Sequence, residues 1–251
     1  MTDLTADKIK SNWDLHLKLV NTFITGERLE KVTAMLESLQ DVMVLAPAAT
    51  KPYHHNAMVG GYVDHVNRVV QGSLEIKQLW EKMGANINFT DEELVFSALF
   101  HDLGKVGDGN VECYVPQSDQ WRRDKLQEYF TVNPKLDFML IQDRSLYLLQ
   151  KFGIELSQNE YIAIRIHDGV YDEANKAYYV SYNPESKLRS NISYILHQAD
   201  MLASKVEYDR WKNSSNSGVK SVKKKTNKGT KQVKGSSNLV GLIKTGIVKD
   251  L

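Results

Sequence analysis

Two histidine–aspartate pairs are the residues most able to do chemistry in this chain. His101–Asp102 ends the apolar run "SALFHDLGKV", and His167–Asp168 ends "IAIRIHDGV". An imidazole beside a carboxylate can bind a metal ion or move a proton. The same dipeptide also arises by chance at the polar end of a buried helix, so the pairs alone do not decide between a site and a helix end.

Further ionisable residues interrupt other apolar helical segments. His65 lies in "GGYVDHVNRVV" and Asp200 lies in "ILHQADMLASK". An ionisable group in a protein core is costly unless it is paired or bound to a metal. We therefore expect His65, His101, Asp102 and Asp200 to converge from three helices on one divalent cation. Mixed nitrogen and oxygen ligands suit Mn²⁺, Fe²⁺, Zn²⁺, Ni²⁺, Co²⁺ or Mg²⁺. By contrast, His16 is predicted to be a surface or core-filling residue with no polar partner.

The order of these segments resembles the HD-domain metal-dependent phosphohydrolases. The segments that carry the resemblance lie roughly between residues 42 and 208, and they read "APAATKPYHHNAMVGGYVDHVNRVV", "ALFHDLGKV", "RSLYLLQKFGIELSQNEYIAIRIHDG" and "ILHQADMLASKVE". The resemblance implies an all-α helical bundle. It also implies hydrolysis of a phosphoester, with a nucleotide as the expected substrate, by a metal-activated water.

Residue by residue, the resemblance implies a complete site. His65, His101, Asp102 and Asp200 would be the metal ligands, and Asp102 would also orient the attacking water. Lys105 would contact a phosphate oxygen, since it follows Asp102 by one helical turn. His167 would line the pocket as a substrate contact, a general acid or a ligand of a second metal.

Three further residues are candidate substrate contacts. His55 precedes His65 by ten residues, where similar proteins place a pocket histidine, and His54 stands beside it. Asp168 is included with its role open, since an apolar residue or a histidine is more usual there. Members of this group that hold two metals carry a histidine where this chain has Ile141 or Gln142, so we expect a site with one metal.

Two other functions remain open from the sequence. The chain could be a nuclease that recruits RNA or DNA through a basic tail, or an HD-fold binding module that docks a partner protein through that tail. Tyrosines in the expected loops could stack on a base or simply pack, namely Tyr53, Tyr171, Tyr178 and Tyr179.

Apolar periodicity predicts that the body of the chain is mostly helical. Helices are expected in segments 13–24, 28–45, 60–84, 90–105, 143–153, 157–168 and 187–211, and loops over 45–56 and 171–186. Two capping boxes, Thr90 with Glu93 and Ser157 with Glu160, mark helix starts. "CYVP" and "EYFTVNP" predict a small β-hairpin around a polar turn.

Composition separates an acidic body from a basic tail. The chain has 251 residues and a net charge of +1, but residues 212–251 hold ten lysines and one acid. The remaining 22 basic and 30 acidic residues give positions 1–211 a net charge of −8. We expect a phosphohydrolase domain over 1–211 and a disordered tail over 212–251, which ends in the short apolar segment "LVGLIKTGIVKDL".

One cysteine excludes an internal disulfide framework, and no segment reads as a signal peptide or a membrane span. A cytoplasmic protein is therefore expected, with a phosphorylated small molecule as its main partner and no membrane contact.

Overall fold

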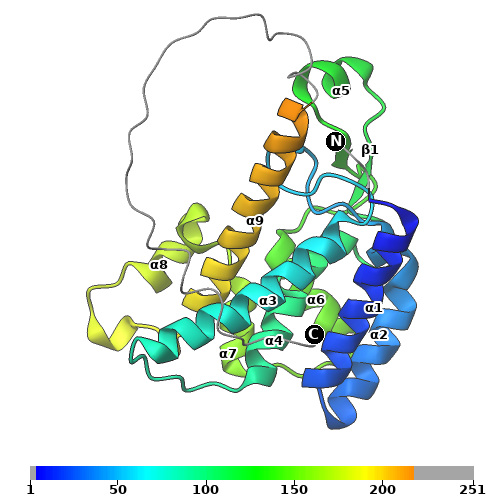
Figure 1. The fold of residues 1–251 in the computed structure, drawn as a ribbon. Helices are drawn as coiled ribbons and strands as arrows, with labels where there is room; N and C mark the ends of the chain where they lie inside the picture. The colour runs from blue at the N-terminus through cyan, green and yellow to red at the C-terminus, as the bar shows by residue number, and fades with distance from the viewer. Residues whose placement is uncertain (1–3, 218–251) are drawn as a thin grey trace, which may run out of the picture.

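The computed structural model describes residues 4–217, which form an all-α bundle with one small hairpin (Figure 1). The helices of this part of the chain are α1 (Ala6–Phe23), α2 (Gly26–Leu45), α3 (Gly61–Lys82), α4 (Asp91–Phe100), α5 (Gln120–Leu126), α6 (Ile141–Lys151), α7 (Gln158–Arg165), α8 (Lys176–Tyr179) and α9 (Ile192–Ser217). Short 3₁₀ turns are η1 (Leu103–Val106), η2 (Gly169–Tyr171), η3 (Glu173–Asn175) and η4 (Pro184–Ser186). The predicted all-α fold is confirmed.

The centre of the bundle is the pair of helices α3 and α9, which lie side by side (Figure 1). Gly72 of α3 faces Ala199 of α9, and these small residues let the two backbones pack closely. α4 packs against α3 and is buried on all sides from Leu94 to Phe100. Such an apolar α4 has no solvent face, so the residues that follow it enter the molecule's interior.

Both predicted capping boxes are present. The Thr90 side chain accepts a hydrogen bond from the backbone of Glu93, and the Glu93 side chain accepts one from the backbone of Thr90. Ser157 and Glu160 make the same reciprocal pair at the start of α7. Caps of this kind contribute about 1 kcal/mol each to stability. Here they set the first residues of α4 and α7, the two helices that lead to the His–Asp pairs.

The predicted hairpin forms between β1 (Tyr114–Pro116) and β2 (Phe130–Val132), which pair antiparallel with Val115 opposite Thr131. The connection between them differs from the expected polar turn. It contains α5, which starts where the Asp119 side chain accepts a hydrogen bond from the backbone of Arg122. The helix buries no residue, so apolar periodicity could not reveal it.

Two other expectations change at the C-terminal side. The expected loop over 171–186 is a series of short helical turns, η2 to η4 with α8. The last helix continues past Trp211 to Ser217, beyond the expected boundary of the domain. Most of the expected tail lies outside the described residues, and so does its apolar segment. Among the described residues, no helix is long and apolar enough to span a membrane.

His16 differs from its prediction, because it is fully buried and has a polar partner. Its Nδ1 lies 3.2 Å from Oδ1 of Asn67, and its ring stacks on Trp13. Asn67 donates its amide to the carbonyl oxygen of Asn12, which leaves Oδ1 to accept from the imidazole. Burial lowers the pKa of His16 to about 4, although the hydrogen bond that its imidazole donates to Asn67 raises it in part.

The buried His16 predicts a loss of stability in mild acid. The unfolded chain binds a proton at its ordinary pKa of about 6.5, whereas the folded chain binds it only near pH 4. The free energy of unfolding should therefore fall by about 1.4 kcal/mol per pH unit over this window as pH decreases. Urea unfolding would measure the free energy of unfolding of wild type and of His16→Gln. The advantage of wild type over the variant should shrink as the pH is lowered from 7 to 4. A constant difference would contradict this assignment.

Candidate metal centre

The structure brings all four predicted metal ligands to one point inside the bundle. His65 comes from α3, His101 is the C-terminal cap of α4, Asp102 follows it, and Asp200 comes from α9. The two histidines are fully buried and Asp102 is nearly so. Nε2 of His65 lies 3.1 Å from Oδ1 of Asp200 and 3.6 Å from Oδ2 of Asp102. Nε2 of His101 lies 3.4 Å from the same Asp102 oxygen.

The turn that presents His101 and Asp102 is fixed by α6. Ser145 Oγ accepts a hydrogen bond from the Gly104 backbone and donates to the carbonyl oxygens of His101 and Ile141. Gly104 packs directly on the Ile141 carbonyl, so any added Cβ would collide with backbone. This close approach explains why glycine follows the His–Asp pair in "HDLGK".

Each imidazole is oriented by a hydrogen bond on its far nitrogen. His101 Nδ1 donates to the carbonyl oxygen of Ala98 and His167 Nδ1 donates to that of Ile164, both at 2.8 Å. His65 Nδ1 lies 3.1 and 3.2 Å from the two carboxylate oxygens of Glu207. A nitrogen that donates leaves the opposite nitrogen free to act as a ligand, which is the usual arrangement of metal-binding histidines.

The donor set fits a cation. Nε2 of His65 and Nε2 of His101 are buried and lack a hydrogen bond of good geometry within the described residues. Two groups of possible ligands share His101, namely His65–His101–Asp102 and His101–His167–Asp200, each with its atoms within 4.8 Å of one another. Unsatisfied buried nitrogens that face carboxylates are what a divalent ion would join.

The charges of the cluster shift the pKa of its members. Burial lowers the pKa of His65, but the charge of Glu207 and the contact with Asp200 outweigh burial and raise it to about 10. Burial raises the pKa of Asp102, but the charges of Lys105 and His101 outweigh it and hold that pKa well below its usual range. Burial also raises the pKa of Asp200, but the hydrogen bond and the charge of His65 outweigh it and keep that pKa below its usual range. The carboxylates therefore stay negative and require positive charge beside them.

Lys105 and His167 both lie beside Asp102. Lys105 Nζ is 2.6 Å from Oδ2 of Asp102, because the 3₁₀ turn η1 brings residues three apart to the same side. His167 Nε2 is 3.6 Å from the other Asp102 oxygen. Burial lowers the pKa of His167, but contacts with Asp102 and the charge of Asp168 raise it to about 9.

A cavity of about 290 Å³ opens at this cluster, and six of the predicted site residues line it: His55, Asp102, Lys105, His167, Asp168 and Asp200. Gln142 also lines the cavity, and its side-chain amide donates a hydrogen bond to Asp172. At this position, where two-metal members of the group carry a histidine, the chain therefore has an amide. His54 is not brought together with the others, since it is exposed and packs edge-on against Tyr53.

None of the four tyrosines considered for base stacking lines this cavity. Tyr179 instead has a structural role, since its hydroxyl donates to the carbonyl oxygens of Ile166 and Ser193. It thereby braces the segment that carries His167. Tyr171 is largely exposed and lies beside His197.

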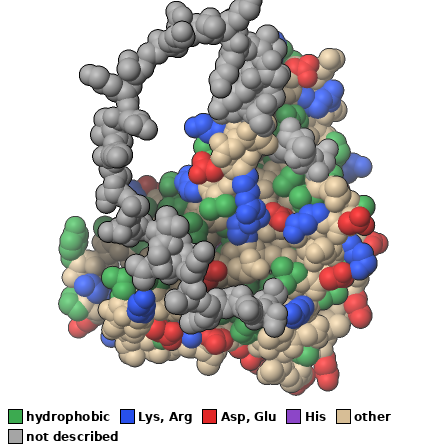
Figure 2. Space-filling view, in the orientation of Figure 1, with side chains coloured by type: hydrophobic (Ala, Val, Ile, Leu, Met, Phe, Trp, Pro, Cys, Tyr) green, Lys and Arg blue, Asp and Glu red, His purple; other side chains and the backbone are tan. Residues whose placement is uncertain are grey.

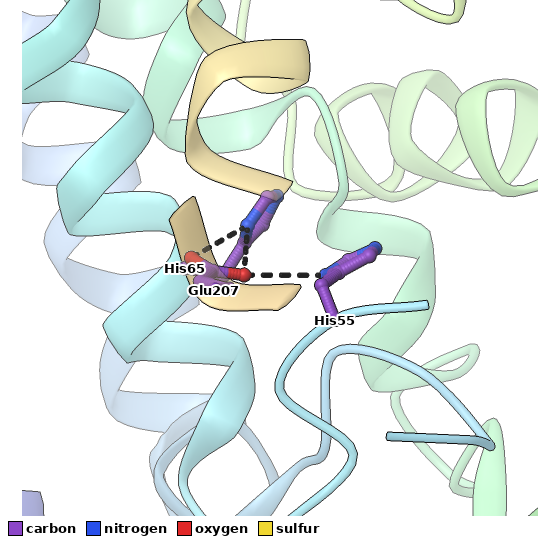
Figure 3. Close-up of side chains that lie close together, drawn as sticks. All are labelled: His55, His65 and Glu207. Carbon is purple, nitrogen blue, oxygen red and sulfur yellow. Dashed lines mark hydrogen bonds and ion pairs between the residues drawn. The ribbon is translucent and has the colours of Figure 1, made fainter. Parts of the chain in front are cut away.

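Glu207 is a candidate site residue that the sequence patterns did not reveal. It is fully buried on α9, seven residues after Asp200 and so on nearly the same face of the helix. Figure 3 shows the His65 and His55 rings directed at its carboxylate, with His65 closest. Arg68 Nε also donates to this carboxylate at 3.0 Å. The sequence did carry a signal for Glu207, since it follows the apolar Ala203 by four residues and so interrupts the apolar face of the helix with an acidic side chain.

Replacing Glu207 by glutamine predicts weaker metal binding with the fold retained. The amide can still contact His65 but no longer supports its imidazole with a negative charge. Loss of such a partner typically lowers metal affinity about 10- to 100-fold. Competition with a chelator of known affinity would measure this. Glu75→Gln, an exposed change on α3, is the matched control, and equal affinities in both variants would contradict the role.

We compared the chain with protein families, curated proteins and solved structures. No family model, curated protein or solved structure matches the chain.

Proposed function

We propose that this protein is a metal-dependent phosphohydrolase of the HD-domain type, which cleaves a phosphoester of a nucleotide. One observation carries the proposal, namely that the four candidate ligands meet in the core beside a cavity: His65, His101, Asp102 and Asp200. The Nε2 atoms of the two histidines lack a hydrogen bond within the described residues, and Lys105 and His167 lie next to them. A purely structural core would bury apolar groups there at lower cost.

The residues divide the work of hydrolysis between them. His65, His101, Asp102 and Asp200 would hold the cation, which supplies a Lewis acid and makes water a nucleophile at neutral pH. Lys105 has three donors and uses one on Asp102, so the others can bind phosphate oxygens. That charge would stabilise the transition state, where negative charge builds on the phosphoryl group.

Asp102 and His167 can move protons. Asp102 faces the metal ligands with Oδ2, which leaves Oδ1 to orient the attacking water. Contacts with Asp102 and the charge of Asp168 raise the pKa of His167 against burial, which favours a proton on Nε2. His167 would donate this proton to the leaving oxygen as a general acid.

The substrate proposal favours a small molecule over nucleic acid. On the face drawn in Figure 2, basic and acidic side chains are interleaved, so this face offers no patch of one sign for a polyanion. The cavity also has four aspartates in its wall. Their charge favours a compact phosphate held by the cation over a long phosphate backbone.

Phosphate release from a panel of mononucleotides tests the proposal. Protein stripped with a chelator should be inactive, and added Mn²⁺ should restore hydrolysis of at least one mononucleotide. Removal of residues 218–251 should leave this activity in place. Hydrolysis of oligonucleotides that depends on those residues would favour the nuclease, and no hydrolysis by metal-loaded protein would contradict the proposal.

A further inference from the structure

A second cavity, of about 220 Å³, shares Lys105 with the cavity at the metal centre. Its walls come from the end of α2, the segment 46–60, η1 and the β1–β2 hairpin. Most of the lining side chains are apolar or aromatic, and Phe130 and Tyr114 contribute rings. Nothing in the proposed chemistry uses this space.

Apolar surface is left open in this cavity. Leu45 is 56% exposed and Val59 is 41% exposed, and both line it. Single exposed apolar residues are common, but a concave apolar surface with a few polar groups is the usual form of a small-molecule site. Sites for whole drug-sized ligands have about 300–1,000 Å³, so this smaller cavity suits a fragment of one ring system.

The walls of the cavity are tied together outside it. The backbone amides of Tyr129 and Phe130 both donate to the carbonyl oxygen of Thr50, at 3.1 and 3.3 Å. Glu128 is buried next to them, accepts hydrogen bonds from Arg122 and Gln117, and lies 3.6 Å from Lys51. The hairpin and the segment 46–60 are thus held as one unit, and the cavity is already formed without a ligand.

Lys105 connects the two cavities. Its ammonium group lies on Asp102 at the metal centre, while its side chain also forms part of the apolar cavity. Lys105 therefore borders both cavities, with its ammonium group on the side of Asp102 and its aliphatic chain along the apolar walls.

We infer that the apolar cavity binds the aromatic ring of the substrate's leaving group, a nucleobase or an aryl group. This inference rests on the proposed function, since it needs a phosphate held at Lys105 and the metal centre. The rings of Phe130 and Tyr114 and the apolar rim at Leu45 and Val59 select aromatic over small aliphatic phosphoesters. The cavity is then the part of the protein that determines substrate class.

Binding of two non-hydrolysable probes tests the inference without any turnover. Phenylphosphonate and methylphosphonate share the anionic group and differ in the ring. Calorimetry on full-length, Mn²⁺-loaded protein should show at least about 10-fold tighter binding of phenylphosphonate, because ring stacking contributes on this scale. Val59→Trp should fill the cavity and bring the two affinities close together.

Two further variants complete the experiment. Leu45→Trp obstructs the rim independently of Val59, and Leu79→Trp adds the same side chain at an exposed position of α3. Leu45→Trp should lower the preference for phenylphosphonate over methylphosphonate, and Leu79→Trp should leave this preference unchanged. Equal affinities in wild type, or a preference that both cavity variants retain, would overturn the inference alone. If neither phosphonate binds, the phosphate site and the inference both fail.

Discussion

Replacing Asp102 by asparagine is expected to remove the bound metal and lower kcat/KM about 1,000-fold or more. The carboxylate of Asp102 lies at the centre of the cluster, near His65, His101, Lys105 and His167. Loss of its charge removes an anionic ligand and leaves the buried Lys105 ammonium without a partner. Metal catalysis contributes several kcal/mol to such reactions, which corresponds to this fall in rate.

Metal analysis and phosphate release on the same preparation would measure both effects. Asp91→Asn, at the exposed start of α4, is the matched control, because it makes the same change on the helix that carries His101. The control should keep its metal and its activity. An Asp102→Asn protein that retained full metal content and full activity would show that the cluster is not the catalytic centre.

Replacing Lys105 by methionine is expected to lower kcat about 100- to 1,000-fold while metal stays bound. Methionine keeps most of the side-chain volume but removes the charge that faces the transferred phosphoryl group. Loss of one electrostatic contact to a transition state typically has this effect. The pKa of Asp102 should also rise, because the charge of Lys105 is the main influence that lowers it against burial.

The division between metal content and rate is the informative readout for Lys105. Lys205→Met, an exposed change on α9, provides the control and should be unaffected in both. If Lys105→Met lost its metal along with activity, Lys105 would act by supporting Asp102. Unchanged kcat would remove Lys105 from the mechanism.

The fold could be predicted from sequence where apolar periodicity and caps coincide. Two helices at the cluster, α4 and α7, start at the capping residues Thr90 and Ser157, whose hydrogen bonds are local and can therefore be predicted from sequence. α5 escaped prediction because it buries no side chain. Arg122 of this helix donates to Glu128, six residues later in the same connection, and this spacing is not part of the helical apolar pattern.

The candidate ligands could be predicted because buried ionisable residues stand out against apolar neighbours. Their partners could not, since these depend on which helices pack together. Glu207 meets His65 only because α9 lies along α3, and His16 meets Asn67 only because α1 packs on α3. The sequence likewise could not separate His55, which lines the cavity, from the adjacent His54, which does not.

A second group of possible metal ligands lies in the same region. His55, His65 and Glu207 also place possible ligand atoms within 4.8 Å of one another (Figure 3). Arg68 donates to Glu207 at this point, however, and its fixed positive charge opposes a cation there. We therefore assign Glu207 the role of orienting His65, with the cation on the opposite side of that ring.

Anomalous diffraction from crystals of Mn²⁺- or Zn²⁺-loaded protein would locate the cation. We expect one strong peak in contact with Nε2 of His65, Nε2 of His101, and the carboxylates of Asp102 and Asp200. A peak on the Nδ1 side of His65, between His55 and Glu207, would contradict the assignment. Loaded protein without a peak at the four residues would contradict the metal centre itself.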